Sequence, residues 1–260
     1  MALALVRSSS PHRRMEWWAD DAVSVRVYEW TAAREGAFCA AETTAFYAIL
    51  EGELEVTFGP SLQRVRAVEG EACLVVGGTP HVYRVAAGSR FVAADFAERS
   101  EPGVRQAALS ADEGRAFVRA FETRAPEALG AAFSTALEVA SRARSVALVP
   151  THSTRRLLEV RRRLDAGLSG PLSLGEVARD FRMHPEYLSR AFRANFGGTP
   201  TEYVRLIRME RFLRSLRGAT SMTQAAAAAG FGDYPTLCRL TAAWFGAPPS
   251  RLVVRTARAA

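Results

Sequence analysis

One segment of the sequence occurs twice in the C-terminal half, and this repeat constrains the fold more than any other feature. Residues 186–200 read EYLSRAFRANFGGTP, and residues 236–249 read TLCRLTAAWFGAPP. With a shift of 49 positions, identical residues coincide at Leu188/Leu237, Arg190/Arg239, Ala194/Ala243, Phe196/Phe245, Gly197/Gly246 and Pro200/Pro249. Any fold for this chain must therefore contain the same helical unit twice.

The periodicity around each copy predicts a pair of helices. In the first copy, a short helix over 174–181 is followed after a tight turn by a helix over 185–195. In the second copy, the corresponding helices span 222–229 and 233–245, and a helix over 200–217 joins the two pairs. Each pair is predicted to be a helix-turn-helix, the motif whose second helix enters the major groove of DNA.

Capping boxes mark the predicted helix starts. In this pattern a Ser or Thr stands three residues before a Glu or Gln, and the two satisfy the free N–H groups of the first turn. The pairs are Ser110/Glu113, Ser173/Glu176, Thr199/Glu202 and Ser221/Gln224. The last three predict an all-helical C-terminal half built from short helices.

The second helix of each pair supplies the candidate DNA-contacting residues. Its large apolar residues are predicted to pack inward, which leaves a polar face outward. The candidates on these faces are Glu186, Ser189, Arg190 and Arg193 in the first copy, and Tyr234, Thr236, Cys238 and Arg239 in the second. A rigid connecting helix can hold the two faces about one turn of DNA apart, roughly 34 Å.

Several of these arginines and Glu186 also have simpler interpretations. Arg190 and Arg239 can be solvated or paired with carboxylates of the same domain. Glu186 can accept a hydrogen bond from cytosine N4, or it can only complement the positive end of its helix. Arg193 lies further along its helix and suits phosphate better than bases. Residues 161–163, three consecutive arginines, form either a solvated face or a patch that steers the protein toward the DNA backbone.

Positive charge is concentrated in the same half of the chain. Residues 150–260 contain 18 arginines and 8 acidic residues, whereas residues 1–149 contain 16 arginines and 19 acidic residues. The overall charge of +7 therefore divides into +10 and −3. All the basic residues are arginine. A positive half beside a mildly negative one favours a polyanionic partner.

The N-terminal part alternates with the period of β-strands. Short runs of apolar residues at every second position are separated by turn signals such as Glu51-Gly52 and Gly77-Gly78. The runs cover residues 23–30, 43–50, 53–58, 72–76, 81–85 and 90–96. Several short strands of this kind predict a small antiparallel sandwich or barrel.

The period becomes helical from about residue 104. Residues 110–142 predict two helices, residues 1–14 a loose tail and residues 144–152 a linker. The predicted fold class is α+β, with an N-terminal antiparallel β-barrel followed by an all-α domain that contains two helix-turn-helix units joined by a linker helix. The predicted boundaries are 15–100 for the barrel, 101–148 for a helical connector and 152–256 for the helix-turn-helix domain.

Residues 155–256 resemble the DNA-binding domain of the AraC/XylS family of bacterial transcription regulators. The resemblance is carried by Leu188, Ser189, Arg190, Phe192, Gly197 and Arg208 in the first copy, and by Gly230, Phe231, Asp233, Arg239, Phe245, Gly246 and Pro249 in the second. The chain departs from the family at His184, where a serine is usual, at Pro235, and at Thr241-Ala242, where Phe-Lys is usual. The departure at Thr241-Ala242 weakens the second unit, so the first is expected to do most of the sequence reading.

Residues 20–97 resemble, less specifically, the cupin-like sensor domain common in that family. The segments AFYAILEGELEVTF and VEGEACLVVGGTPHVYRV carry this resemblance. It implies a small-molecule effector in the barrel and subunit pairing through the helices of residues 110–142. The candidate effector contacts are Phe46, Phe58, His81 and Tyr83. The same aromatic residues can instead form core, and His81 can be a structural turn residue.

No metal, cofactor or enzymatic activity is predicted. Metal-dependent cupin enzymes use about three histidines and a glutamate as ligands, but only His81 of the four histidines falls in the predicted barrel. The three scattered cysteines argue against a disulfide framework or a zinc site. No apolar run reaches the roughly 18 residues that a membrane span needs, so no membrane partner is expected, and the cytoplasm is the default compartment.

The sequence therefore predicts a cytoplasmic, sequence-specific DNA-binding transcription regulator. The expected partners are double-stranded DNA, a second copy of the chain and a small effector, with RNA polymerase as a further candidate. Control is expected through the effector or through dimer geometry in the barrel. Two alternatives remain: a regulatory interaction protein with impaired DNA binding, and a cupin-type enzyme with a helical appendage, which the missing metal ligands disfavour.

Overall fold

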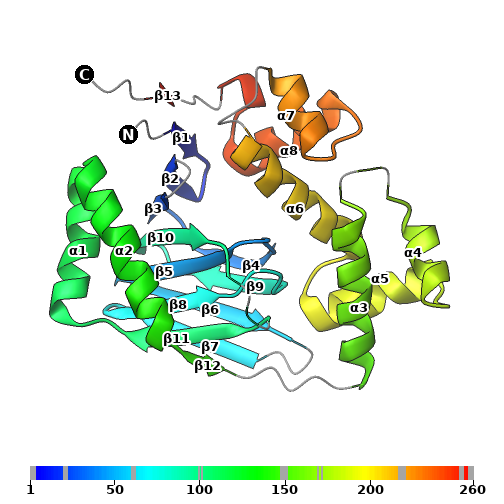
Figure 1. Ribbon diagram of the computed structural model, residues 1–260, viewed down its shortest axis with the longest axis horizontal. Helices are drawn as coiled ribbons and strands as arrows, with labels where there is room; N and C mark the ends of the chain where they lie inside the picture. Colours follow the sequence, from blue (N-terminus) through cyan, green and yellow to red (C-terminus); the bar gives the residue numbers. More distant parts are fainter. Residues whose placement is uncertain are drawn as a thin grey trace.

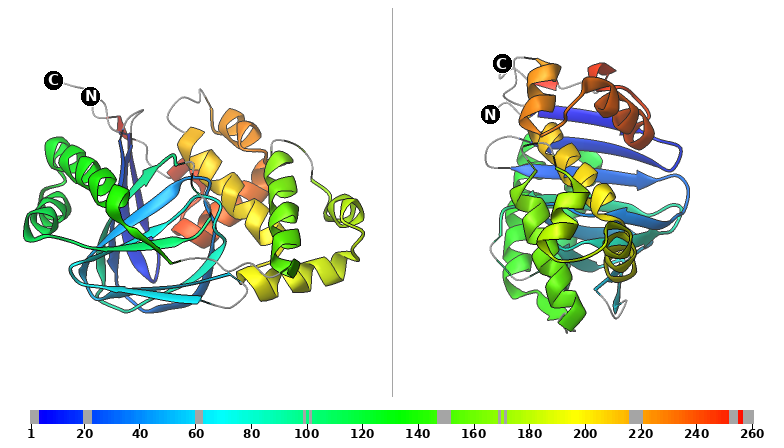
Figure 2. Two further views of the ribbon diagram at one scale, coloured as in Figure 1. Left: turned by 60° about the horizontal axis from the view of Figure 1, so that its bottom comes forward. Right: turned by 90° about the vertical axis from the view of Figure 1, so that its right-hand side faces the viewer.

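The chain folds into three layers. The computed structural model describes residues 4–19, 23–59, 63–98, 100, 102–146, 152–168, 170, 172–215, 221–251 and 255–256. Two helices, α1 (Ala111–Thr123) and α2 (Pro126–Arg142), cover one side of the β-sheets, and the later helices lie on the other side (Figures 1 and 2). The sheets thus stand between the connector helices and the helices that contain the repeat.

The middle layer consists of two antiparallel sheets. Nine described strands form the larger sheet in the order β12-β11-β8-β5-β10-β3-β2-β1-β13, and four form the smaller one in the order β4-β9-β6-β7. The strand bounds are β1 Ala4–Ser9, β2 Arg13–Ala19, β3 Ser24–Trp30, β4 Arg34–Cys39, β5 Thr44–Glu51, β6 Glu53–Phe58, β7 Gln63–Val68, β8 Glu71–Val75, β9 His81–Val85, β10 Arg90–Phe96, β11 Val104–Ala108, β12 Arg144–Val146 and β13 Arg255–Thr256.

Alternation along each strand decides which side chains the two sheets enclose. In β6, Leu54, Val56 and Phe58 are buried, while the residues between them are partly exposed. They belong to the same apolar cluster as Tyr28 and Phe91 of the larger sheet. Because side chains point alternately to the two faces of a strand, one face of each sheet builds this shared barrel core.

The outer face of the larger sheet is covered by α1 and α2. Phe46 of β5 stacks on Phe117 of α1 with ring centroids 5.5 Å apart. Leu129 and Val139 of α2 are fully buried in the same cluster. This apolar contact places the connector helices on the face of the sheet opposite to the barrel core.

The remaining described helices form the C-terminal domain. Their bounds are α3 His152–Ala166, α4 Leu174–Asp180, α5 Pro185–Phe196, α6 Pro200–Ser215, α7 Met222–Ala228 and α8 Tyr234–Phe245, followed by the short 3-10 helix η1 Pro249–Arg251. The predicted α+β fold is confirmed, with α4–α5 and α7–α8 as the two helix-turn-helix units and α6 between them. No described helix has the length and apolarity needed to cross a bilayer.

The predicted capping boxes explain where these helices begin. Ser110 and Glu113 cap each other's backbone N–H groups at the start of α1. Thr199 and Glu202 do the same at α6, where the Thr199 N–H donates to Glu202 at 2.7 Å. The side chain of Ser173 accepts from the third residue of α4. The sequence pattern located these helix starts because such hydrogen bonds are local.

Two expectations about connecting segments were wrong. Residues 4–9 and 13–14 are not a loose tail, because β1 pairs with β2 and β2 pairs with β3. Residues 144–146, expected in a linker, form β12 and pair with β11. Residues 147–151 of that linker lie outside the described residues, and its last residue, 152, begins α3. The segment at 4–14 pairs locally, in hairpins of successive strands, whereas β12 pairs with β11 across the two connector helices, and neither segment has a local alternation that shows it.

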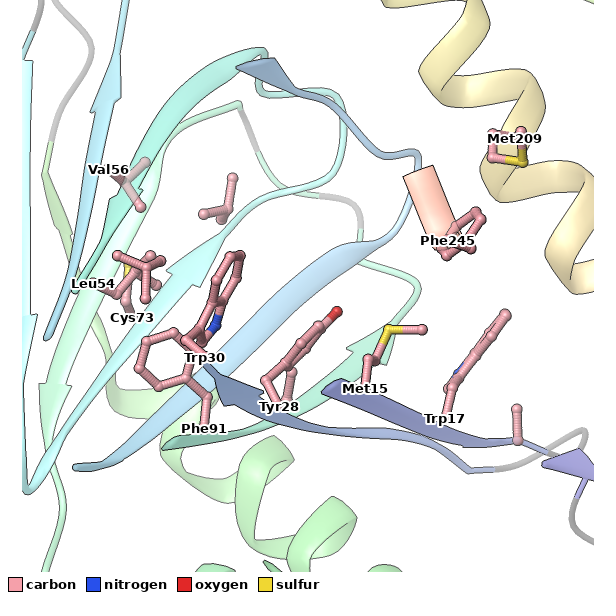
Figure 3. Packing of buried hydrophobic residues seen from close by; sticks show 14 of the residues in the cluster. Met15, Trp17, Tyr28, Trp30, Leu54, Val56, Cys73, Phe91, Met209 and Phe245 are labelled. Atoms are coloured by element: carbon pink, nitrogen blue, oxygen red, sulfur yellow. The ribbon is translucent and has the colours of Figure 1, made fainter. Parts of the chain in front are cut away.

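The second helix-turn-helix unit shares its apolar core with the barrel. Leu237 and Phe245 of α8 and Met209 of α6 belong to the same buried cluster as Met15 and Trp17 of β2 (Figure 3). A Cβ added at Gly246, directly after α8, would lie 2.6 Å from the backbone oxygen of Ser9. The end of α8 is therefore in close contact with the β1–β2 hairpin.

The first unit contacts the smaller sheet through two glycines at the end of α5. A Cβ at Gly197 would lie 2.1 Å from a methyl carbon of Val82, and one at Gly198 would lie 2.1 Å from the ring of Phe38. Gly197 also has a φ of +88° and ends α5 as its C-cap. Glycine is needed here both for the helix end and for the approach to the barrel.

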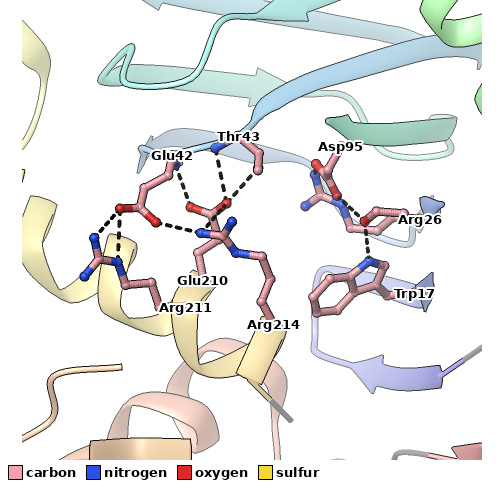
Figure 4. A network of polar contacts seen from close by, with 9 residues as sticks. Trp17, Arg26, Glu42, Thr43, Asp95, Glu210, Arg211 and Arg214 are labelled. Atoms are coloured by element: carbon pink, nitrogen blue, oxygen red, sulfur yellow. Dashed lines mark hydrogen bonds and ion pairs between the residues drawn. The ribbon is translucent and has the colours of Figure 1, made fainter. Parts of the chain in front are cut away.

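A polar network also joins α6 to the loop before β5 (Figure 4). Glu42 accepts hydrogen bonds from Arg211 at 2.5 Å and from Arg214 at 2.6 Å. Glu210 accepts from the Glu42 N–H at 2.6 Å and from the Thr43 hydroxyl at 2.7 Å. We call these five residues the α6 network. They hold the helix between the two helix-turn-helix units against the barrel.

The two carboxylates of the α6 network have opposite pKa shifts. Burial disfavours the charged form of Glu42, but the hydrogen bonds and charges of Arg211 and Arg214 outweigh it and lower the pKa. Burial dominates at Glu210 and raises its pKa, although Arg214 and Thr43 oppose the shift. Glu42 is therefore the fixed anion of the contact, and Glu210 is held at an energetic cost when it is charged.

Candidate nucleic-acid interface

The first candidate reading helix, α5, is fixed by its caps and by its buried face. His184 is the N-cap and accepts the N–H of Glu186 at 3.4 Å, a long hydrogen bond. Leu188, Phe192 and Phe196 are buried, and the last two rings meet edge to face at 4.6 Å. The apolar stripe anchors α5 against its own domain and leaves the opposite side facing outward.

The outward side of α5 carries three of the predicted contacts together. Glu186 and Arg190 are exposed and Ser189 is partly exposed. With Leu174 and Pro185 they line a shallow groove at the start of the helix. Neither Glu186 nor Arg190 has a side-chain hydrogen bond or ion pair within the described part of the chain. Both side chains can therefore turn toward an external partner.

Arg193, the fourth candidate on α5, already has a partner. It lies 3.2 Å from Glu202, which also caps the start of α6. Burial opposes ionisation of Glu202, but hydrogen bonds from Thr199 and Arg193 prevail and lower the pKa of the carboxyl. Because both side chains are well exposed, the pair contributes little stability. A phosphate can compete for Arg193 only by displacing Glu202.

The second candidate reading helix, α8, has a strong cap. Asp233 accepts the N–H of Thr236 at 2.7 Å. Hydrogen bonds from the Thr236 N–H and side chain lower the pKa of this fully exposed carboxyl. Asp233 is thus the conventional N-cap that α5 lacks, and α8 begins where the repeat predicts.

The outward side of α8 presents few groups that can read bases. Its exposed residues are Pro235, Arg239, Ala242 and Ala243. Proline and alanine offer no hydrogen bonds to base edges, so Arg239 is the long polar side chain on this face. Its Nη2 donates to the Thr236 hydroxyl at 2.9 Å, which turns the guanidinium back toward the helix start.

The other predicted contacts on α8 are less accessible. Tyr234 and Cys238 are partly buried, and Tyr234 packs against the core shared with the barrel. Thr241, where the family has phenylalanine, is fully buried, and its hydroxyl bonds the Leu237 and Cys238 carbonyls. The helix thus satisfies this buried hydroxyl internally, and its apolar packing comes partly from the barrel.

The three consecutive arginines of α3 do not share one role. Arg161 is buried, 8% exposed, and its guanidinium lies against Gly78 of the barrel. Arg163 pairs with Asp180 of α4 at 3.0 Å. Both alternatives considered from the sequence, a solvated face or a steering patch, fail for Arg161. It lies at the contact between α3 and the barrel, which only the tertiary structure shows.

The predicted effector contacts lie in two separate places. Three of them lie on β6 and β9, which are neighbouring strands of the smaller sheet. Phe58 of β6 pairs with His81 of β9, and Val56 of β6 pairs with Tyr83 of β9. Phe46 lies on the outer side of the larger sheet, against α1. The structure therefore brings together three of the four residues, and Phe46 is not among them.

His81 is held inside the barrel wall. Its Nδ1 lies 2.9 Å from the Thr79 carbonyl. Burial lowers the pKa of the ring to about 4, against the hydrogen bond to Thr79. The imidazole is therefore neutral near pH 7. Among the described residues no three His, Cys, Asp or Glu side chains gather as they would around a metal ion.

Residues 177–255 match the helix-turn-helix domain family. The match begins within α4 and includes α5, α6 and the second unit, and it supports the resemblance drawn from the repeated motif. A helix-turn-helix domain binds DNA through the second helix of each unit. No curated protein matches the sequence.

Solved structures of ToxT from Vibrio cholerae are similar over most of the chain. An apo point variant from strain SCE256 superposes with a TM-score of 0.51 at 10% identity, covering 89% of this chain and 96% of ToxT. The wild-type protein of that strain with a bound unsaturated fatty acid gives 0.51 at 11% identity, covering 89% and 94%. ToxT from Vibrio cholerae O395 gives 0.50 at 9% identity, covering 89% and 96%.

At such low identity the likeness to ToxT concerns the fold. It matches the order found here, with antiparallel sheets first and helices afterwards. Residues 177–255 are therefore a helix-turn-helix DNA-binding domain of the AraC type, in a chain that has the fold of ToxT.

Proposed function

We propose that this protein is a sequence-specific transcription regulator whose first helix-turn-helix unit reads bases and whose second unit mainly holds the DNA backbone. The observation that carries the proposal is the outward side of α5. There Glu186, Ser189 and Arg190 line one groove at the helix start, and two of them have no competing partner. Glu186 can accept a hydrogen bond from cytosine. Ser189 can donate to or accept from a base edge, and Arg190 can donate to guanine.

The proposed role of the second unit follows from its face. Arg239 can reach a phosphate, and the alanines beside it allow close approach of the backbone without base contacts. Tyr234, Thr236 and Cys238 then act at most at the edge of that contact. The proposal assigns Arg193 to phosphate as well, in exchange with its Glu202 partner.

We further propose that the barrel controls how the two units are presented. One ToxT structure contains an unsaturated fatty acid, and the analogy of fold supports a small effector for this chain. The proposal is supported by the direct contacts of the barrel with α5, α6 and α8. A ligand that alters the barrel wall would change these contacts.

A homodimer through α1 and α2 completes the proposal. Val118 of α1 and Leu137 of α2 are 40% and 42% exposed, which is high for such apolar side chains. The segments then have the roles expected from the sequence: residues 15–100 sense, 101–148 connect and pair subunits, and 152–256 bind DNA. Recruitment of RNA polymerase belongs to the same expectation.

Selection on random duplex DNA tests the proposed function. Purified full-length protein is incubated with a random library at two salt concentrations, and the bound fraction is sequenced. The proposal predicts one enriched motif, with binding that weakens steeply as salt rises. Recovery of unenriched DNA at both salt concentrations, with and without effector candidates, would overturn it.

A further inference from the structure

Two described residues other than glycine have a left-handed backbone conformation, and both are arginines. Arg124 follows α1 with a φ of +55°, and Arg182 lies in the turn between α4 and α5 with a φ of +51°. A residue with a Cβ rarely adopts this conformation, because the Cβ then approaches the following carbonyl oxygen. Such strain persists where other contacts compensate for it.

Arg124 has compensating contacts inside the molecule. Its guanidinium lies over the ring of Phe121, 4.4 Å from the centroid, and its Nε lies 3.8 Å from Glu16. Arg182 is exposed, and its side chain has no hydrogen bond, ion pair or ring contact within the described part of the chain. The contact that compensates for the strain at Arg182 is therefore expected with an external partner.

The second helix-turn-helix unit shows what the same turn position contains elsewhere in this chain. The backbone hydrogen bonds of the two turns coincide with a shift of 48 positions, so that Arg182 corresponds to Gly230. Gly230 has a φ of +85°, and a Cβ there would lie 2.0 Å from the carbonyl oxygen of Leu168. The first unit thus carries a guanidinium at a position whose backbone favours glycine.

A second arginine lies beside Arg182. Arg179 is in the last turn of α4, and its carbonyl oxygen accepts the Arg182 N–H at 3.0 Å. Its side chain is exposed and has no partner among the described residues either. The next residue, Asp180, faces α3 and pairs there with Arg163 at 3.0 Å. We call Arg179 and Arg182 the turn arginines.

The end of α4 does not need these two side chains. Arg156 of α3 donates to the Phe181 carbonyl there, so the helix end already has a cationic donor. The end of α4 also lies at the outer edge of the molecule, away from the two sheets (Figures 1 and 2). The turn arginines therefore form a positive surface that is open to an external partner.

This surface adjoins the groove of the first reading helix. α5 begins at Pro185, three residues after Arg182, and Pro185 lines the groove together with Glu186 and Arg190. Side chains that read bases in a major groove have phosphates on both sides of them. The planar fork of arginine matches the oxygens of a phosphate.

We propose that the turn arginines hold the DNA backbone beside the bases that α5 reads, with Arg182 as the main contact. They position α5 and carry no sequence information, since a phosphate is the same at every base. In the complex a phosphate supplies the contact that Arg182 lacks within the chain. This inference rests on the proposed DNA binding and adds positioning residues to the first unit.

The test uses the full-length protein, the selected duplex and a duplex of unrelated sequence. Fluorescence anisotropy at several salt concentrations measures affinity, and thermal unfolding measures stability. Arg182→Gln removes the charge and keeps the backbone strain, Arg182→Gly removes both, and Arg182→Lys keeps the charge. The matched control is Arg124→Gln, which changes the other left-handed arginine on the far side of the sheets.

The inference predicts that Arg182→Gln and Arg182→Gly weaken binding to both duplexes about three- to tenfold and lower the salt slope by about one. Arg182→Lys should keep the wild-type slope, and Arg179→Gln should weaken binding at least about twofold. Arg182→Gly should also raise the melting temperature by up to about 3 °C, because glycine relieves the strain. Arg124→Gln should lower the melting temperature and change affinity less than about twofold.

Neutral phosphates identify the contact directly. Methylphosphonates replace single phosphates around the bases that α5 reads, one position at a time. At one position or more, the replacement should weaken the wild-type protein at least about threefold and Arg182→Gln less than about twofold. Equal effects on both proteins at every position would show that Arg182 touches no phosphate.

The other outcomes separate this inference from the proposed function. Unchanged affinity and salt slope in Arg182→Gln would overturn it, and so would lower melting temperatures in both Arg182→Gln and Arg182→Gly. Unchanged DNA binding with lost transcription of a reporter would mean that the turn arginines contact a protein. If no motif is enriched but Arg182→Gln still weakens binding to the unrelated duplex, the phosphate contact stands and the proposed base reading fails.

Discussion

Arg190 and Arg239 occupy the same position of the two repeat copies, but their surroundings differ. Arg190 lies beside Glu186 and Ser189 in a groove and has no internal partner among the described residues. Arg239 bonds Thr236 and lies near the exposed N-cap Asp233, and the other exposed residues of α8 are Pro235 and two alanines. Identical residues in a repeat therefore need not have the same function. The difference between them predicts two distinct effects on DNA binding.

Arg190→Ala is expected to cost about 1–3 kcal/mol on the preferred site and to relax specificity there. Arg239→Ala should weaken binding to preferred and scrambled duplexes about equally and lower the salt slope by about one. Fluorescence anisotropy at several salt concentrations measures both effects. Arg119→Ala, which removes an exposed arginine of α1 on the far side of the sheets, is the control for charge alone. Equal loss of specificity in both variants would contradict the division of roles.

The cap of α5 gives a second prediction for a single residue. His184 accepts the Glu186 N–H at the long distance of 3.4 Å, whereas serine is a preferred N-cap. His184→Ser should raise the free energy of unfolding by up to about 1 kcal/mol. Thermal unfolding of the full-length protein checks this change. An unchanged or lower melting temperature would mean that the histidine makes a contact beyond its cap.

At the scale of elements, the end of α5 shows how the helices and the barrel fit together. Gly198 lies directly against the ring of Phe38 on β4, with no space for a side chain. Gly198→Ala should therefore destabilise the protein by about 1–3 kcal/mol through overpacking. In the Phe38→Ala background the same substitution should cost much less, because the colliding ring is absent. Thermal unfolding of the four proteins gives the coupling, and additive effects would show that the two residues do not interact.

The elements that the sequence predicted best are those with local signals. The capping boxes and the repeat located α4 through α8 because a helix is specified by neighbouring residues. Strand β12 was missed because its partner β11 precedes α1 and α2 in the chain, and β1 was missed because its sequence lacks a clear alternation of apolar and polar residues, although it pairs with the neighbouring β2. In β4, which contains Gly36, the alternation is too weak to show a strand. The tertiary contact of Arg161 with Gly78 likewise has no signal in the sequence.

In the candidate site, too, the features set by neighbouring residues were predictable and those set by contacts between elements were not. The outward positions of α5 were predictable from helical spacing, and the structure places Glu186, Ser189 and Arg190 together on that side. That Glu202 pairs with Arg193 depends on how α5 meets α6, which spacing alone does not specify.

At the scale of the whole molecule, the α6 network links the barrel to the helix between the two DNA-binding units. Its two carboxylates should respond oppositely to pH. The lowered pKa of Glu42 means that its contribution to stability is present above its unfolded pKa of about 4.3 and is lost as pH falls through the lower folded value. The raised pKa of Glu210 means that its contribution declines as pH rises from about 4.3 through the folded value.

Two substitutions test this assignment. Glu42→Gln should destabilise the protein near pH 7, by about 1 kcal/mol or less because Glu42 is only half buried, and the difference should shrink only as the pH falls below about 4. Glu210→Gln keeps an acceptor for Thr43 and should compare more favourably with wild type at pH 7 than at pH 4. Urea unfolding at several pH values measures both, with Glu35→Gln at the exposed Arg84 pair as the control. Parallel pH profiles for the two variants would contradict the assignment.

The most direct test of the whole account is a footprint on the selected duplex. Hydroxyl-radical protection shows where the backbone is held, and methylation interference shows which bases are read. The account predicts protection next to two successive major grooves, about one helical turn apart, with base interference concentrated in one of them and lost in Arg190→Ala. Interference of equal strength in both grooves would contradict the proposal that the first unit reads bases and the second mainly contacts the backbone. The absence of any protected site would contradict DNA recognition by this chain.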